Sequence, residues 1–291
     1  MQDAPPARTD QPGAEATETA GGAVVISGAF QPPAEHVRSA FGVHGDGHGE
    51  LVDSGAGWRY DDVVLRPAPD PSRAAWVAQT LDGLKVPGVR VAQPLRSTDG
   101  RWVIGGWSAQ RFVEGTPQAR HDDVVAVAVR LHQATFDLPR PKFIDGRVDA
   151  FAIADRAAWG EEEVRLKPEL GGRLFDVLVG SRRDVKLRSQ LVHGDLFGTV
   201  LFHGDAAPAI TDFVPYWRPP EWAAAVAVVD AVAWGGADAE ILRRWSHLPQ
   251  WPQALLRAVL FRLAGHALHP HAHAESLRGL EIAAHQVTEL L

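Results

Sequence analysis

The sequence predicts an α+β chain, with short strands of an antiparallel sheet toward the N-terminus and mostly helices toward the C-terminus. Between residues 51 and 107, short apolar runs alternate with turns rich in Gly, Pro and Asp, which is typical of hairpins. From residue 116 onward, apolar residues recur at helical spacing. Residues 190–217 return to short apolar runs that end at acidic residues. At 291 residues, the chain is long enough for one large domain or for two lobes around a cleft.

The composition excludes several classes of protein. Hydrophobic residues at 45% and charged residues at 22% are ordinary for a soluble globular chain. A net charge of -7 argues against nucleic acid or an acidic membrane surface as the main partner. The absence of cysteine removes disulfides, thiolate zinc sites and cysteine nucleophiles. No signal peptide is visible, and the longest apolar run (222–234) is too short to span a bilayer, so we expect a cytoplasmic protein.

The N-terminal region carries few signals of order. Residues 1–22 are rich in Ala, Pro, Glu, Thr and Gly without a large apolar residue, which predicts a disordered tail. Residues 42–50 form a Gly-rich loop with His44, Asp46 and His48. These three side chains are potential metal ligands, but Gly-rich loops do not preorganise ligands, so we expect a solvated linker.

Residues 51–66 predict a strand, a turn containing Gly55 and Gly57, and a second strand that ends at Arg66. Glycines allow backbone N–H groups to approach phosphate oxygens, and a cation on the neighbouring strand neutralises their charge. A plain hairpin turn followed by a surface arginine has the same pattern. Phosphate binding is therefore one of two interpretations of this segment.

Helices are predicted on both sides of a further hairpin at residues 89–107. Ser72 is a suitable N-cap for a helix over residues 73–84, and residues 122–136 have a broad apolar face behind two N-terminal aspartates. His132 lies in this second helix, where we expect it to be a packed structural residue.

The remaining segments are predicted to be helical. Residues 150–180 form two helices broken at Gly160 or at residues 167–168, and the acidic run 161–163 is either a solvated face or a rim for a cationic substrate. The tryptophans of residues 219–291 are expected in the core or, less favoured, in the walls of a substrate cleft. Four histidines (His266, His269, His271 and His273) flank a proline, and because alternating residues around proline rarely converge, we expect an exposed loop rather than a metal site.

Residues 190–217 contain the predicted centre of the site. One apolar strand leads into Asp195, and the strand 209–211 ends at Asp212. A hairpin between these two aspartates would bring their carboxylates to the same end of a small sheet. Two carboxylates in this position can orient a hydroxyl group and hold a divalent cation, which are the two requirements of phosphoryl transfer.

The run HGDL at 193–196, followed by an apolar strand, a turn and ITD at 210–212, resembles the catalytic core of the aminoglycoside phosphotransferase and choline kinase family. The segments DLFGTVLF and PYWRPPEWAAAV resemble an uncharacterised actinobacterial branch of that family more closely. The resemblance covers most of the chain from about residue 50. It implies a two-lobed α+β protein-kinase-like fold, with a small antiparallel-sheet N-lobe at 23–109, a hinge at 110–116 and a larger, mostly helical C-lobe at 117–291.

The resemblance also implies roles for individual residues. Asp195 would accept or orient the proton of an attacking hydroxyl, and His193 would fix its loop by hydrogen bonds. Asp212 would ligate Mg²⁺ bridging the phosphates of ATP. Arg66 corresponds by position to the phosphate-contacting lysine of the family. Backbone groups near Phe112 and Val113, in the hinge, would bind the adenine edge.

Two departures from the family pattern concern the metal and the phosphates. The family places an asparagine, the second metal ligand, five residues after the aspartate. That position is Val200, or Thr199 if the loop is one residue shorter, and a threonine hydroxyl can ligate Mg²⁺. The glutamate that pairs with the strand cation is also missing from residues 72–84, where only Gln79 and Asp82 could replace it.

The sequence thus predicts an ATP- and Mg²⁺-dependent phosphotransferase that acts on a hydroxyl of a small molecule. The alternative is a catalytically degenerate relative that binds a nucleotide, a small molecule or a protein partner. The identity of the substrate and the oligomeric state stay open at this stage.

Overall fold

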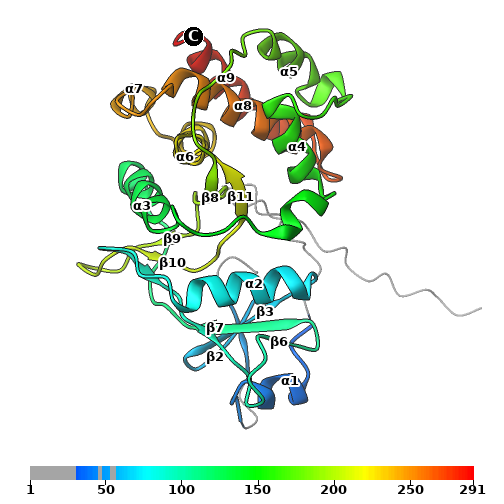
Figure 1. The fold of residues 1–291 in the computed structure, drawn as a ribbon, viewed down its shortest axis with the longest axis vertical. Coiled ribbons are helices and arrows are strands. Elements are labelled where there is room, and N and C mark those ends of the chain that lie inside the picture. Colours follow the sequence, from blue (N-terminus) through cyan, green and yellow to red (C-terminus); the bar gives the residue numbers. More distant parts are fainter. Residues whose placement is uncertain (1–30, 45–47, 53–56) are drawn as a thin grey trace, which may run out of the picture.

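The computed structural model describes residues 31–44, 48–52 and 57–291. The predicted tail at 1–22, Asp46 and Gly55 lie outside these ranges. The described elements form two lobes, one built on a sheet and the other mostly helical (Figure 1). The predicted two-lobed α+β fold is therefore confirmed, whereas the proposed lobe boundaries stay predictions.

The smaller lobe is built on an antiparallel sheet in the order β1-β2-β3-β7-β5, with β6 also paired to β7. Its strands are β1 (Glu50–Leu51), β2 (Trp58–Tyr60), β3 (Val63–Pro67), β5 (Pro94–Leu95), β6 (Val103–Ile104) and β7 (Trp107–Arg111). Helix α1 (Glu35–Ala40) covers one face, where Val37 and Phe41 pack with Leu65 and other strand residues. Helix α2 (Pro71–Asp82) lies between the sheet and the larger lobe (Figure 1).

The start of α2 differs from the prediction. Asp70, not Ser72, is the N-cap, because its carboxylate accepts a hydrogen bond of 3.0 Å from the backbone N–H of Arg73. Pro71 occupies the first helical position, where its fixed φ suits the helix and its missing N–H is not needed. Ser72 therefore lies inside the first turn.

The larger lobe is organised around two buried helices, α6 (Pro220–Ala233) and α8 (Trp251–Leu268). Both are apolar around most of their circumference, which is the pattern of a helix enclosed by neighbours. The helices around them are α3 (His121–Ala134), α4 (Ala150–Trp159), α5 (Gly172–Val179), α7 (Ile241–Arg244) and α9 (Arg278–Thr288). Short 3-10 helices, η1 (Lys142–Gly146), η2 (Pro168–Leu170) and η3 (Ala274–Leu277), connect them.

Several sequence expectations for this lobe are confirmed. Of the four tryptophans expected in the core, Trp222 and Trp251 are fully buried, whereas Trp234 and Trp245 are half-buried and pack against it. Helix α4 ends at Gly160, which has the left-handed conformation (φ 75°) that glycine adopts most easily. No helix in the described ranges is both long and apolar enough to cross a lipid bilayer.

Two small sheets connect the lobes to the predicted centre of the site. Strand β8 (Gln190–His193) pairs antiparallel with β11 (Pro215–Arg218). Strands β9 (Val200–Leu201) and β10 (Ala209–Ile210) form the hairpin predicted between Asp195 and Asp212. Strand β4 (Arg90–Val91) joins β10 in parallel, so a segment that follows α2 is bonded to the β9–β10 hairpin.

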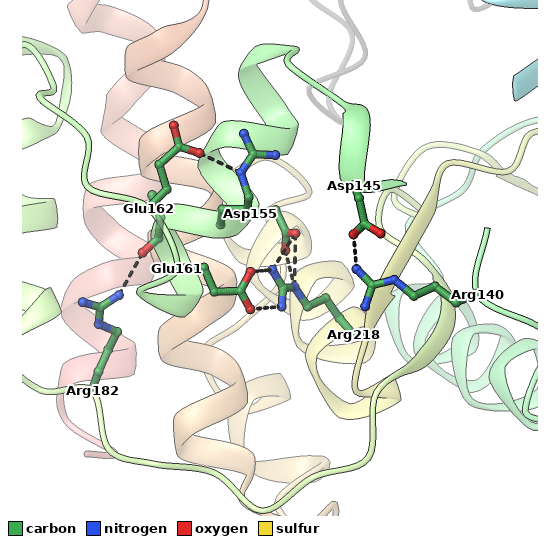
Figure 2. Close-up of polar contacts among 9 residues, drawn as sticks. Arg140, Asp145, Asp155, Glu161, Glu162, Arg182 and Arg218 are labelled. Atoms are coloured by element: carbon green, nitrogen blue, oxygen red, sulfur yellow. Dashed lines mark hydrogen bonds and ion pairs between the residues drawn. The ribbon is translucent and has the colours of Figure 1, made fainter. Parts of the chain in front are cut away.

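Arg218, at the end of β11, fastens this sheet to α4. Its Nε and Nη2 atoms donate to the carboxylate of Asp155, and both Nη atoms donate to Glu161 at 2.6 and 2.7 Å (Figure 2). Glu162 accepts a hydrogen bond of 2.7 Å from Arg156. Two members of the acidic run 161–163 therefore pair with arginines, so this run is not a free rim for a cationic substrate.

Candidate active site

His193 ties together the two loops that carry the acidic residues. The backbone N–H of Asp195 donates to its Nδ1 at 3.1 Å, and its Nε2 donates to the carbonyl of Asp212 at 3.0 Å. One neutral tautomer, protonated on Nε2, satisfies both contacts. Burial lowers the pKa of His193 to about 4, so the ring is neutral at pH 7. His193 therefore fixes the backbone of both loops and does not carry a charge.

His132 supports His193 from α3. Its Nε2 accepts a 3.0 Å hydrogen bond from the backbone N–H of His193, and its carbonyl accepts one from the Gln190 side chain. Burial lowers its pKa to about 3. His132 is thus the packed structural histidine that the sequence predicted.

The residue between His193 and Asp195 must be glycine for reasons of space. A Cβ atom at Gly194 would lie 2.4 Å from Cδ2 of Tyr216, which is inside van der Waals contact with a buried ring. The backbone N–H of Gly194 also donates to the Val214 carbonyl at 3.0 Å, which extends the pairing of β8 with β11. The close approach of the two strands fixes where the Asp195 loop begins.

Asp195 is held by an ion pair that sequence reasoning missed. Its Oδ1 accepts a hydrogen bond of 2.7 Å from Nη2 of Arg262 on α8. Arg262 in turn donates from Nε to Asp230 on α6 at 2.7 Å. The side chains of Arg262 and Asp230 are 3% and 0% exposed. A chain of charged groups, with Asp230 and Arg262 buried, therefore runs from the core of the larger lobe to the half-buried candidate catalytic carboxylate.

The environment of Asp195 changes its acidity. Burial raises its pKa to about 7, while the positive charge of Arg262 acts in the opposite direction and the negative charges of Asp230 and Asp212 add to the rise. Asp195 and Asp212 are thus close enough to influence each other. A carboxyl group with a pKa near 7 can accept a proton at physiological pH and release it again.

Asp212 lies beyond the end of β10 and is exposed. One carboxylate oxygen, Oδ1, accepts a 2.7 Å hydrogen bond from the backbone N–H of Phe213, and the ring of Phe213 packs edge-on against His193. Asp212 lines a cavity of about 270 Å³ that also holds Arg66. Its second carboxylate oxygen has no protein partner in the described part of the chain, so it is available to a cation.

The side chains of Thr199 and Val200, the two predicted candidates for a second metal ligand, have different surroundings. Val200 pairs opposite Ile210 in the hairpin, and its side chain is buried in the core. Thr199 is half-buried, and its hydroxyl donates to the carbonyls of Asp195 and Leu196 at 3.1 and 3.0 Å. Only Thr199 therefore keeps an oxygen that could face a cation.

Four of the five residues predicted to bind the nucleotide (Gly57, Arg66, Phe112 and Val113) lie in the described ranges. Gly57 packs against β3 so closely that a Cβ atom would lie 2.7 Å from the Leu65 carbonyl oxygen. Arg66 lines the cavity, and its buried Nε has no hydrogen-bond partner among the described residues. The backbone N–H of Phe112 donates to the Asp62 carbonyl at 2.7 Å, so it is already engaged. Among described residues, Val113 has no backbone hydrogen bond, so its groups are free for an adenine edge.

The histidines of the C-terminal part do not converge on a metal. His266 contacts the Leu170 carbonyl and the Ser276 hydroxyl, while the rings of His269 and His271 lie 5.7 Å apart. Within the described ranges, no group of three or more His, Cys, Asp or Glu side chains is placed to hold an ion.

Comparisons with known proteins bear on the fold. No protein-family model and no curated protein matches the sequence. A spectinomycin phosphotransferase, solved in complex with ADP and spectinomycin, matches 88% of this chain and 97% of its own at 12% identity, with a TM-score of 0.52. A choline/ethanolamine kinase family protein from Mesorhizobium loti matches 87% of this chain and 92% of its own at 15% identity, with a TM-score of 0.50. A choline kinase from Streptococcus pneumoniae matches 83% and 93% at 11% identity, with a TM-score of 0.50.

These matches confirm, at the level of the fold, the resemblance that the HGDL and ITD runs indicated. At such low identity they carry no information about individual residues, because a fold hosts many activities. The roles of the site residues must therefore be argued from the contacts of this chain.

Proposed function

We propose that this chain, which has the protein-kinase-like fold of aminoglycoside phosphotransferases and choline kinases, transfers the γ-phosphate of ATP to a hydroxyl group of a small molecule. The observation that carries the proposal is the pair of acids on two neighbouring loops. His193 joins the backbone of Asp195 to that of Asp212, and Asp212 lines a cavity together with Arg66. The ADP in the similar spectinomycin phosphotransferase supports a nucleotide as the donor.

Asp195 is the group that would orient the attacking hydroxyl. Phosphoryl transfer passes through a loose transition state, so the enzyme must position the nucleophile more than it must deprotonate it strongly. The 2.7 Å bond from Arg262 fixes the Asp195 carboxylate in one orientation. Its second oxygen, Oδ2, has no contact with Arg262 and is the atom that would accept the hydroxyl proton.

The donor atoms near Asp212 fit a Mg²⁺ ion bound with a nucleotide. Mg²⁺ prefers one or two carboxylates together with phosphate oxygens and water. The free oxygen of Asp212 and the hydroxyl oxygen of Thr199 are hard ligands of this kind. When bound, the ion would neutralise charge on the phosphates, while Asp212 would hold its position relative to Asp195.

Several broader features belong to the same proposal. The small lobe at 23–109 would bind the nucleotide, residues 110–116 would form the hinge, and the lobe at 117–291 would hold the acceptor. In the hinge, the groups of Val113 would bind the adenine edge. A cytoplasmic location follows from the use of ATP.

A second candidate function rests on the ion pair of Asp195 with Arg262. A carboxylate already neutralised by a buried guanidinium suits a protein that binds a nucleotide without transferring phosphate. The lack of a glutamate on α2 agrees with this interpretation. In this case the chain would be a binding module for a nucleotide, a small molecule or a protein partner.

The experiment that separates these functions combines binding with turnover. Mg²⁺ and ATP should raise the unfolding midpoint of the wild-type protein, and Asp212→Asn should abolish the rise. Asp195→Asn should retain nucleotide binding and lose phosphate transfer to a panel of hydroxyl compounds. Asp205→Asn, in the exposed turn of the hairpin, is the matched control and should behave as wild type.

The outcomes are distinct for each function. Binding of ATP without turnover on a broad panel would support the binding module. An unfolding midpoint unaffected by any nucleotide would refute both.

A further inference from the structure

The cavity between the two lobes contains two arginines from different elements. It is lined by β3, β7, α2 and residues 211–214, and its volume is about 270 Å³. Arg66 extends from β3 and Arg73 from the first turn of α2, with Asp212 on the side of the larger lobe. Helix α2 lies between the sheet and the larger lobe (Figure 1), and five of its residues line this cavity.

The two arginines lack a directly paired carboxylate in the part of the chain that the structure describes. Among the described residues, no carboxylate forms an ion pair with Arg66 or with Arg73, and the buried Nε of Arg66 has no hydrogen-bond partner. Asp70 also lines the cavity, but its Oδ1 is used to cap α2. Burying a cation without a partner is costly, so two sheltered guanidinium groups indicate an anionic ligand.

The surroundings of Arg73 strengthen this conclusion. Burial lowers its pKa, and the nearby positive charge of Arg147 lowers it further, whereas Asp149 and Asp212 act against this. Arg147 is already engaged, because it pairs with Asp149 at 2.8 Å and donates to the Pro215 carbonyl. Asp149 is thus taken by Arg147, and among the described residues no carboxylate is left in direct contact with Arg73.

Helix α2 offers no acid to the strand cation. Its cavity-lining residues are Arg73, Ala74, Val77, Ala78 and Leu81. The two residues that sequence considered as replacements for a glutamate, Gln79 and Asp82, are exposed and do not line the cavity. The charged side chain that this helix contributes to the cavity is therefore a cation, Arg73.

We propose that Arg73 is a second phosphate-binding side chain, which together with Arg66 holds the polyphosphate of the donor nucleotide. This inference rests on the proposed nucleotide-dependent function. A guanidinium group matches phosphate oxygens with two parallel N–H donors and stays charged. Two such groups favour the ligand with the most negative charge, so affinity should rise from AMP to ADP to ATP, and inorganic triphosphate should bind on its own.

The test is a calorimetric titration of AMP, ADP, ATP and inorganic triphosphate into wild type, Arg73→Met and Arg73→Lys. A charged hydrogen bond of this kind is worth about 10- to 100-fold in affinity. Arg73→Met should weaken ATP and triphosphate by that factor and AMP much less, while Arg73→Lys should retain part of the affinity. Arg165→Met, which removes an exposed arginine outside the cavity, is the control and should bind as wild type.

Charge reversal gives the sharpest discrimination. A carboxylate in Arg73→Glu would pair with Arg66, so tighter ATP binding by this variant would show that the position serves an ion pair, and the proposal would be overturned. Unchanged ATP affinity in Arg73→Met would overturn it as well, while the proposed phosphotransferase activity would stand. A wild-type protein that binds none of the four ligands would refute both. Arg73→Gln serves in place of Arg73→Met should the methionine variant not fold.

Discussion

The buried chain of charges behind Asp195 makes a quantitative prediction for Arg262→Met. Arg262 donates to both Asp195 and Asp230, and its side chain is 3% exposed. The methionine retains most of the volume but leaves two carboxylates without a counter-charge. Breaking a buried pair in this way costs about 3–5 kcal/mol. At about 2 °C per kcal/mol for a chain of this size, the unfolding midpoint should fall by about 6–10 °C.

The deficit should also depend on pH, with a definite sign. The two carboxylates of the variant have lost the guanidinium that favours their charged form, so their pKa values rise. Without the guanidinium, these buried carboxyl groups are more costly to keep charged than in the wild type, and lowering the pH removes this cost because it protonates them. The difference in the free energy of unfolding between wild type and Arg262→Met should therefore be smaller at pH 5 than at pH 8.

Thermal unfolding followed by calorimetry at both pH values measures these effects. Arg101→Met is the matched control, because Arg101 pairs with Asp99 on the surface, where the side chains are 65% and 51% exposed. Such a pair is worth about 1 kcal/mol or less. If Arg262→Met lost no more stability than Arg101→Met, or lost the same amount at pH 5 and pH 8, the buried charge chain would not have the role described above.

Three further predictions concern the loops around Asp195. The pKa of His193 is about 4 in the folded state and about 6.5 in the unfolded state. Lowering the pH from 7 to 4 should therefore reduce the free energy of unfolding of the wild type by about 3 kcal/mol more than that of His193→Asn. Denaturant titrations at each pH measure this, and parallel pH curves would contradict it. Thr199→Val should raise several-fold the Mg²⁺ concentration that ATP needs to stabilise the protein. If the variant is less stable but its Mg²⁺ dependence is unchanged, the hydroxyl serves only to hydrogen-bond the Asp195 carbonyl within its loop. Gly194→Ala should destabilise by about 1–3 kcal/mol through the clash with Tyr216, while Gly83→Ala, with open space around it, should change stability little. Equal midpoints for the two alanine variants would contradict the clash.

The parts of the fold that sequence predicted well are those fixed by local chemistry. The β9–β10 hairpin is bounded by residues with strong turn preferences, and its register, with Val200 opposite Ile210, needs only a short loop to close. The break after α4 lies at Gly160 for the same kind of reason. The N-cap of α2 was missed by two residues, because both Asp70 and Ser72 are good caps and the proline between them decides.

The charge chain could not be predicted because its contacts are distant in sequence. Arg262 meets Asp230 across 32 residues and Asp195 across 67 residues. The local signal was two charged residues within each of two otherwise apolar helices, which is consistent with a buried pair but does not identify which residues form it. The packing of α6 against α8 supplies that information.

The pairing of β9 with β10 bears on which residue, Thr199 or Val200, takes the proposed second metal position. Direct spacing placed the asparagine position at Val200, and a loop shorter by one residue placed it at Thr199. The pairing of β9 with β10 buries the side chain of Val200 and leaves Thr199 as the last residue of the loop. Its hydroxyl proton is already shared between two carbonyls of that loop, so only oxygen lone pairs remain for a further partner. A lone pair on a hard oxygen is what Mg²⁺ binds, so in the proposed site a threonine in place of asparagine would retain an acceptor oxygen.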